Sequence, residues 1–168
     1  MGDSLKPMVI SRTFDAPRRR VWQAWTEVEH LKQWFSPKGF AVIAAKMDLR
    51  PGGTYHYGLR TPQGQEMWGL WTFREIQAPE RLVLVNSFSD SSGGVTRHPL
   101  APTWPREMLS TTTFTEKEGK TTITLEWLPL NATPEEIATF EAGRAGMTQG
   151  WNGTWEQLTA YLGKGMTP

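Results

Sequence analysis

The sequence of 168 residues contains no cysteine, which excludes disulfide bonds, thiolate nucleophiles and cysteine-based metal sites. Histidine is also scarce, and His30, His56 and His98 are widely separated. None of them takes part in the H-E-x-x-H or H-x-x-x-H spacing that places two imidazoles on one face of a helix. We therefore expect no metal site and no other cofactor.

Long apolar runs and blocks of like charge are missing as well. No segment approaches the roughly 18 apolar residues of a membrane span, and residues 1–7 lack the apolar core of a signal peptide. These absences predict a cytoplasmic protein without a membrane span. The net charge is +1, and the basic run at residues 18–20 is short. We interpret it as the solvated start of a helix and expect no nucleic-acid partner.

Tryptophan, by contrast, is abundant. The chain has nine Trp, seven Met and seven Phe, whose large, polarisable side chains either pack a core or line a cavity for an organic ligand. A hydrophobic content of 38% and a charged content of 21% are ordinary for a globular protein. We expect one domain over residues 8–163, between an N-terminal tail (1–7) and a C-terminal tail (164–168).

Hydrophobic periodicity predicts a strand over residues 8–14 and then a helical segment. Pro17 suits the first turn of that segment, and Asp15 is its expected N-cap. Over residues 18–35 the apolar side chains recur at steps of three and four, and a break is expected within 27–30. The segment therefore predicts two short helices.

The middle of the chain is typical of an antiparallel meander, because strand-like stretches alternate with turns rich in Gly and Pro. Six strands are expected, at residues 40–49, 54–59, 66–76, 81–88, 107–114 and 121–128. Gly58 and Gly69 lie within two of them and predict bulges or sharp curvature.

Residues 89–106 interrupt this rhythm with a long segment rich in Ser, Gly and Pro. One interpretation is an excursion over the surface. The other is a lid over a pocket, with Trp104 folded inward and Arg97 or Arg106 meeting an anionic group of a ligand.

The last part of the chain predicts a long helix. Thr133 is the expected N-cap and Pro134 the first helical residue, and the glycines at 143–146 favour a break. An apolar face follows, made of Met147, Trp151, Trp155, Leu158 and Leu162. Because a sheet with an apolar face needs a cover, the predicted fold class is α+β. A curved antiparallel sheet wraps around the long C-terminal helix, and two short helices follow the first strand.

Six stretches carry a resemblance to a known family. They are Phe14-Asp15-Ala16-Pro17 with Val21-Trp22-Gln23-Ala24-Trp25, Leu31-Lys32-Gln33-Trp34-Phe35, Asp48-Leu49-Arg50-Pro51-Gly52-Gly53, Ile76-Gln77-Ala78-Pro79-Glu80-Arg81-Leu82, Gly119-Lys120-Thr121-Thr122, and Met147-Thr148-Gln149-Gly150-Trp151 with Leu158. In this order they resemble the Aha1-like domains, a branch of the START and birch-pollen-allergen-like helix-grip superfamily named after the activator of Hsp90 ATPase. The resemblance implies a deep cavity between the sheet and the C-terminal helix.

The expected wall of this cavity consists mainly of aromatic side chains from the sheet and the last helix. Alternation along a strand places Trp71 and Phe73 on one face, and places Ser110 and Thr112 on the same face as Met108. The candidate ligand-binding residues are Trp34, Phe35, Tyr55, Tyr57, Trp71, Phe73, Phe88, Trp104, Met108, Thr112, Trp127, Met147, Trp151 and Trp155.

The expected function is the binding of a small hydrophobic or aromatic ligand, by a monomer or a homodimer. One alternative is an enzyme, a cyclase, hydrolase or isomerase, which needs a polar pair in the cavity such as His56 with Glu66. His56 alternates with Tyr55 and Tyr57, so either the imidazole or the two phenols face inward. No catalytic residue is assigned. A chaperone ATPase as partner is the other alternative, which the name of the family suggests.

Overall fold

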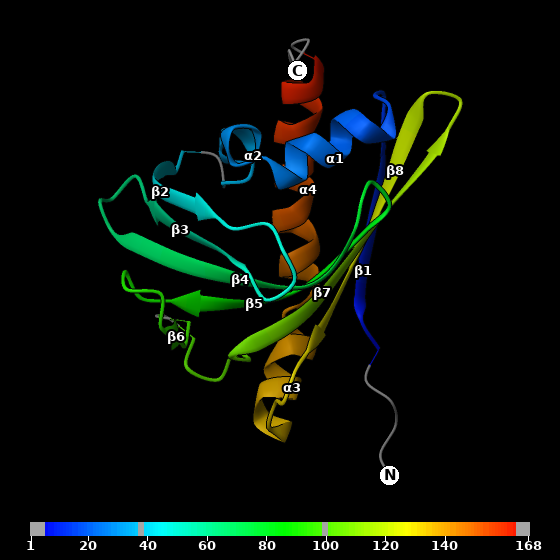
Figure 1. Ribbon diagram of the computed structural model, residues 1–168. Coiled ribbons are helices and arrows are strands. Elements are labelled where there is room, and N and C mark those ends of the chain that lie inside the picture. Colours follow the sequence, from blue (N-terminus) through cyan, green and yellow to red (C-terminus); the bar gives the residue numbers. More distant parts are fainter. Residues whose placement is uncertain (1–5, 37–38, 99–100, 164–168) are drawn as a thin grey trace.

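One curved antiparallel sheet forms the framework of the protein (Figure 1). The computed structural model describes residues 6–36, 39–98 and 101–163. The strands follow the order β1-β8-β7-β5-β4-β3-β2, and β6 pairs with β5 beside this path. Their bounds are β1 Met8–Phe14, β2 Ala41–Met47, β3 Thr54–Arg60, β4 Glu66–Gln77, β5 Arg81–Ser89, β6 Val95–Thr96, β7 Glu107–Lys117 and β8 Lys120–Pro129. The six strands expected after the helix pair are confirmed, and β6 is an additional short strand.

Along strand β7, buried side chains that face the core alternate with side chains that face away from it. Its inward-facing side chains, all buried, are Met108, Ser110, Thr112 and Phe114. The threonines between them have branched side chains, which suit a pleated surface. The turn into β8 has a positive φ at both central residues, Glu118 (55°) and Gly119 (79°), as a two-residue type I′ hairpin requires.

Two short helices, α1 (Arg18–Thr26) and α2 (Val28–Trp34), follow β1 as predicted. They are separated at Glu27, which has an extended backbone. The prediction of Asp15 as the N-cap of α1 was wrong, because Pro17 occupies that position and no side chain caps the helix locally. The backbone N–H of Arg18 instead donates to a carboxylate oxygen of Glu116 on β7, over 3.0 Å. A contact distant in the sequence therefore satisfies the first N–H group of the helix.

The C-terminal helical region consists of α3 (Pro134–Ala142) and α4 (Arg144–Gly163), and the predicted break falls at Gly143. Thr133 caps α3 in a capping box with Glu136: the hydroxyl of Thr133 accepts from the Glu136 N–H, and the Glu136 carboxylate accepts from the Thr133 N–H. Both the cap and the break were predicted. Among the described residues, no helix is long and apolar enough to cross a membrane.

Gly58 lies opposite a bulge, because it pairs with Ala44 and the register shift of β2 falls between Val42 and Ala44. Gly69 does not mark a bulge, since the other register shift lies between Phe73 and Glu75. A Cβ atom on Gly69 would lie 2.3 Å from the Tyr57 phenol, and one on Gly58 would lie 2.7 Å from the Trp68 ring. Each glycine thus makes room for an aromatic ring of the neighbouring strand.

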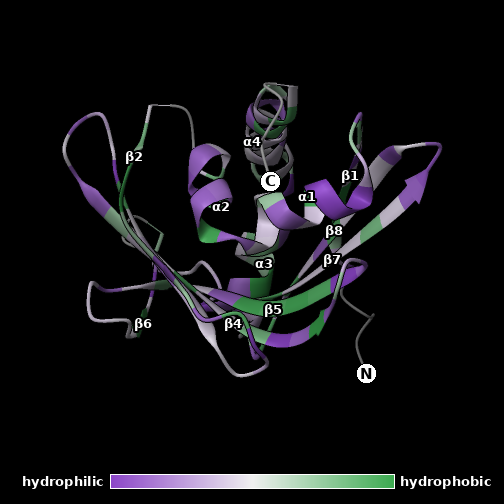
Figure 2. Ribbon diagram, turned by 45° about the horizontal axis from the view of Figure 1, so that its top comes forward, coloured by the Kyte–Doolittle hydropathy of each residue, from purple (hydrophilic) through white to green (hydrophobic). Residues whose placement is uncertain are grey.

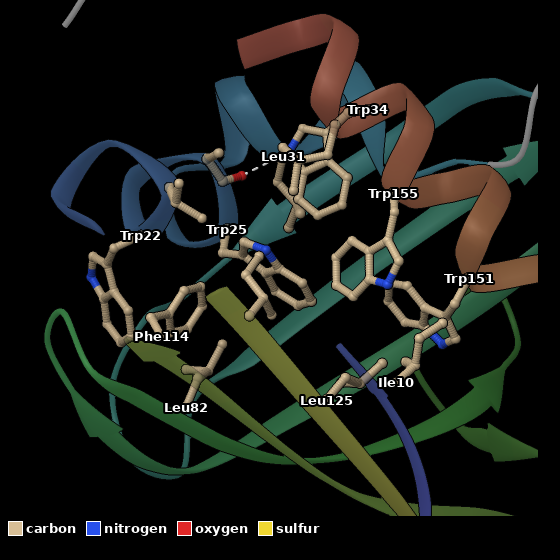
Figure 3. Close-up of a cluster of buried hydrophobic side chains, with 14 of the residues drawn as sticks. Ile10, Trp22, Trp25, Leu31, Trp34, Leu82, Phe114, Leu125, Trp151 and Trp155 are labelled. Atoms are coloured by element: carbon tan, nitrogen blue, oxygen red, sulfur yellow. Dashed lines mark hydrogen bonds between the residues drawn. The ribbon is translucent and has the colours of Figure 1, made fainter. Parts of the chain in front are cut away.

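The hydrophobic core lies on the concave side of the sheet, where α1, α2 and α4 also lie (Figure 2). Trp155 of α4 packs edge-on against Phe14 at 5.6 Å between ring centroids, and Trp22 of α1 packs in the same way against Phe114 at 5.2 Å. Figure 3 shows Trp22, Phe114 and Trp155 with Trp34, whose indole N–H donates to the carbonyl of Ala24 over 3.0 Å. Aromatic side chains therefore connect α1 and α4 to the sheet, and Trp34 connects α2 to α1.

Candidate functional site

A cavity of about 440 Å³ lies between the concave face of the sheet and the first half of α4. Strands β4, β5, β7 and β8 form its floor, and α4 covers it. The lining residues are Trp25, Phe35, Tyr57, Trp71, Leu84, Asn86, Ser87, Phe88, His98, Ala101, Trp104, Met108, Ser110, Leu125, Trp127, Gly143, Gly146, Met147 and Trp151. A volume of this size is typical of a small-molecule site.

Indole rings dominate the wall of the cavity. Trp25 of α1 lies nearly parallel to Trp151 of α4 (6.1 Å between centroids, 12° between planes) and to Trp71 of β4 (6.2 Å, 26°). Phe35 and Trp127 add edge-on contacts, Phe35 to Trp71 at 5.1 Å and Trp127 to Trp151 at 5.7 Å. The wall is a packed aromatic layer, and its shape is set by rigid rings with few rotatable bonds.

Tyr57 is the phenol of this wall. Its ring faces inward and lies over Gly69, edge-on to Phe35 at 5.6 Å. Burial raises the pKa of the Tyr57 phenol to about 12, and a hydrogen bond with the Trp71 side chain opposes part of that rise. The phenol is therefore neutral at physiological pH and can both donate and accept a hydrogen bond.

Two polar side chains stand on the floor. Asn86 of β5 lies between Trp71 and Met108, its partners on the neighbouring strands. Ser110 of β7 accepts a hydrogen bond from the indole N–H of Trp127 over 3.1 Å. Both side chains lie among apolar neighbours.

The segment after β6 forms one side of the cavity and is attached to α3. Trp104 lines the cavity, packs against Phe140 at 6.3 Å and approaches Gly143, where an added Cβ would lie 3.0 Å from its ring. Thr103 accepts a hydrogen bond from the Thr139 hydroxyl over 2.8 Å. The inward position predicted for Trp104 is therefore observed.

The predicted role of Arg97 in holding an anionic ligand is not supported by its position. Its guanidinium donates to Glu136 of α3 over 2.6 Å and to the carbonyl of Pro102 over 3.2 Å. Arg106, the other cation proposed for this role, is exposed and does not line the cavity. Both arginines lie away from the cavity because the ion pair with Glu136 and the solvent are the better environments for a charge. Residues 99–100 of this segment lie outside the described residues.

A second hollow of about 300 Å³ adjoins the first. It is lined by Phe35, Tyr57, Leu59, Trp127, Met147, Gly150, Trp151 and Thr154, and five of these residues also line the main cavity. The space beneath α4 therefore continues along the helix, past the side chains of Met147 and Trp151.

The imidazole and carboxylate considered for an enzyme lie outside the cavity. His56 stacks on Trp68 at 5.1 Å and donates from Nε2 to the carbonyl of Asp90 over 3.0 Å. Glu66 accepts hydrogen bonds from Trp68 (3.1 Å) and from Arg60 (3.4 Å). Both belong to the sheet face opposite to Tyr55 and Tyr57, so the phenols are the side chains that face inward. Within the described residues, no group of three or more metal-ligating side chains forms.

Comparisons with known proteins agree with this architecture. The model of the family described as "Activator of Hsp90 ATPase homolog 1-like protein" matches residues 15–163. The chain belongs to this Aha1-like family. The comparison with curated proteins found no match.

Solved structures share the Aha1-like fold over most of their length. A protein from Mycobacterium smegmatis is 24% identical, with a TM-score of 0.75 over 94% of this chain and 91% of the other. A protein from Nitrosomonas europaea is 25% identical, with a TM-score of 0.75 over 96% and 97%. A protein from Arthrobacter aurescens is 25% identical, with a TM-score of 0.76 over 95% and 87%. The resemblance inferred from six sequence stretches is thus confirmed.

Of the fourteen candidate residues, the Aha1-like fold brings nine together around the cavity. These are Phe35, Tyr57, Trp71, Phe88, Trp104, Met108, Trp127, Met147 and Trp151. The other five are buried in the core and do not line it, namely Trp34, Tyr55, Phe73, Thr112 and Trp155. Trp155 lies one turn beyond Trp151 on the same face of α4, so this face of the helix passes from the main cavity into the core within one turn.

Sequence reasoning missed several lining residues of this Aha1-like chain. Asn86 and Leu84 precede Phe88 by two and four positions on β5, so alternation from Phe88 could have found them. Trp25 was recognised only as part of an apolar helix face. No local signal identifies His98, which reaches the cavity beside Phe88 at 4.6 Å and whose pKa is lowered by burial.

Proposed function

We propose that this protein binds a small hydrophobic molecule in the cavity beneath α4. The observation that carries the proposal is the cavity of about 440 Å³. Eight of its lining side chains are Trp, Phe or Tyr, and Leu84, Leu125, Met108 and Met147 supply most of the remaining apolar surface. Burial of apolar surface in such a site supplies about 25 cal/mol per Å². The cytoplasmic location and the choice between monomer and homodimer stay predictions.

Neither alternative function gains support from the geometry. The polar pair named as an example for an enzyme, His56 with Glu66, lies on the outer face of the sheet. The clue expected for a chaperone partner is a large exposed apolar patch. The exposed large hydrophobic residues of the described chain are Val9, Leu49 and Val95. Val9 lies on β1, at the opposite edge of the sheet from β2, which Leu49 follows.

Binding of N-phenyl-1-naphthylamine, an uncharged fluorescent probe, tests the proposal. Gly146 and Gly153 form a matched pair on α4, because an added Cβ meets no atom within 4 Å at either site, while only Gly146 lines the cavity. We expect saturable binding by the wild-type protein, at least about tenfold weaker binding by Gly146→Phe, and unchanged binding by Gly153→Phe. Absence of saturable binding, or equal losses in the two variants, would refute the proposal.

A further inference from the structure

We infer that the ligand is an uncharged, flat aromatic compound carrying an oxygen that hydrogen-bonds to Asn86 and Ser110. This inference rests on the proposed function and specifies the chemistry of the same site. Three features of the cavity support it: the absence of charged lining residues, the unpaired amide on its floor, and a hydroxyl that is already oriented by an indole.

The first feature is electrical neutrality. None of the 19 described residues that line the cavity is Lys, Arg, Asp or Glu, and burial lowers the pKa of the His98 imidazole, which favours its neutral form. The arginines nearest in the fold are engaged elsewhere: Arg97 with Glu136, and Arg144 with Glu141 and the carbonyl of Pro7. A carboxylate that entered would lose its hydration and find no cation, at a cost of several kcal/mol. Fatty acids and other organic anions are therefore poor ligands for this site.

The second feature is the side chain of Asn86. It stands between Trp71 and Met108 across the strands and between Leu84 and Phe88 along β5. Within the described part of the chain, its amide makes no hydrogen bond, although the lining around it is largely apolar. An amide offers two donors and one acceptor. A ligand that enters without a polar atom would leave these groups both desolvated and unpaired, which costs about 1–3 kcal/mol.

The third feature is the hydroxyl of Ser110. It accepts from the Trp127 indole N–H over 3.1 Å, so its own proton is available to donate. Ser110 pairs with Leu84 across the strands and Asn86 pairs with Met108, which makes Asn86 and Ser110 diagonal neighbours. Diagonal neighbours in an antiparallel sheet are about 7–8 Å apart. The two side chains can therefore both reach one oxygen of a planar ligand, whose rings contact the indoles of the wall.

Competition for bound N-phenyl-1-naphthylamine by four naphthalene derivatives separates these features. The competitors are naphthalene, 2-naphthol, 2-naphthoate and 2-naphthyl-trimethylammonium at pH 7. We expect 2-naphthol to bind most tightly, about fivefold or more tighter than naphthalene, because it adds a hydrogen bond. The carboxylate should bind at least about tenfold more weakly than 2-naphthol. The ammonium compound tests whether the indole faces attract a cation instead.

Two variants assign the preference to residues. Asn86→Leu, which nearly preserves volume, should reduce the advantage of 2-naphthol over naphthalene to about twofold or less. Ser110→Ala should reduce that advantage in part. Asn152→Leu is the control, because Asn152 is exposed on α4 and contacts Arg12 outside the cavity. Thermal unfolding of each variant verifies that it is folded.

The outcomes distinguish this inference from the function on which it rests. If the fluorescent probe does not bind saturably to the wild-type protein, the proposed function fails. If the probe binds and the charged competitors displace it as well as 2-naphthol does, only the present inference fails. It also fails if Ser110→Ala and Asn86→Leu both retain the full preference for 2-naphthol.

Discussion

Gly69 lies directly beneath the phenol ring of Tyr57, so closely that a Cβ atom at position 69 would come within 2.3 Å of the hydroxyl oxygen. Because Tyr57 lines the cavity, a glycine on β4 fixes the position of one cavity wall. Such close approach of a backbone to a side chain is possible only without a Cβ.

Gly69→Ala should therefore displace Tyr57 toward the cavity. We expect a loss of about 1–3 kcal/mol in the free energy of unfolding, as overpacking of a core commonly causes, together with weaker binding of N-phenyl-1-naphthylamine. Gly58→Ala is the matched control, because its Cβ would meet the ring of Trp68 on the outer face of the sheet at 2.7 Å. That variant should lose stability and keep its affinity. Loss of affinity in both variants would contradict the relation between Gly69 and the cavity wall.

Thr112 and Thr121 offer a second matched pair. Both are fully buried, but the Thr121 hydroxyl donates to the carbonyl of Ala16 over 2.7 Å, whereas the Thr112 hydroxyl has no hydrogen-bond partner among the described residues. Replacing an unpaired buried hydroxyl by a methyl group removes a desolvation penalty. We expect Thr112→Val to raise the free energy of unfolding by about 1 kcal/mol and Thr121→Val to lower it by about 1–2 kcal/mol, measured by urea denaturation.

The affinity of Thr112→Val for N-phenyl-1-naphthylamine is a second measurement on this residue. Because Thr112 does not line the cavity, Thr112→Val should bind the fluorescent probe as the wild-type protein does. A decrease in stability would show that the hydroxyl has a partner in the free protein, and a change in affinity would show that it has one when a ligand is bound.

The three tyrosines predict a specific response to alkaline pH. Burial is the main cause that raises the pKa of each phenol above 10.0, to about 12 for Tyr57, with Tyr55 and Tyr161 shifted in the same direction. Ultraviolet titration should therefore detect little phenolate at pH 10 in the folded protein and much more in denaturant. Substantial phenolate in the folded protein at that pH would contradict the burial of these rings.

The same shifts link stability to pH. A phenol whose pKa is higher in the folded state contributes stability below the unfolded pKa, and this contribution is lost as pH rises through the folded value. The free energy of unfolding should thus fall between about pH 10 and pH 12. Tyr57→Phe should reduce the steepness of that fall, as denaturation at several pH values would measure.

The ion pair between Arg97 and Glu136 predicts a dependence on acidic pH. Arg97 is the main cause that lowers the pKa of the Glu136 carboxyl below its ordinary 4.5. A carboxyl group whose pKa is lower in the folded state contributes stability above its unfolded pKa. This contribution disappears as pH falls through the folded pKa. Glu136→Gln should lower the free energy of unfolding by about 1–3 kcal/mol at pH 7 and by much less at strongly acidic pH. Glu135→Gln is the control, because it removes the same charge from the exposed side of the first turn. It should lower the free energy of unfolding by less than Glu136→Gln does at either pH.

Much of the fold could be predicted because its signals are local. The hairpin at Glu118 and Gly119, the capping box at Thr133 and the break at Gly143 each depend on residues close in the sequence. The N-cap of α1 could not be predicted, because its first N–H is satisfied by Glu116, nearly a hundred residues away.

The cavity was less accessible to prediction, for a geometric reason. Alternation identifies the inward face of a strand, but it does not say where along that face the core ends and the cavity begins. Phe73 and Trp71 share a face on β4, yet only Trp71 lines the cavity. The boundary depends on how the curved sheet and α4 diverge, which is set by contacts among many elements at once.

The gathering of indoles at one site has a spectroscopic consequence. Five of the nine tryptophans line the cavity, and among them Trp25 stacks on both Trp71 and Trp151, with ring centroids 6.2 Å and 6.1 Å apart. Any occupant displaces water from these chromophores and alters their mutual coupling. The intrinsic emission and the near-ultraviolet circular dichroism of the protein should therefore report occupancy directly. A mixture of unlabelled compounds can be screened by optical readout alone, with the chain serving as its own sensor.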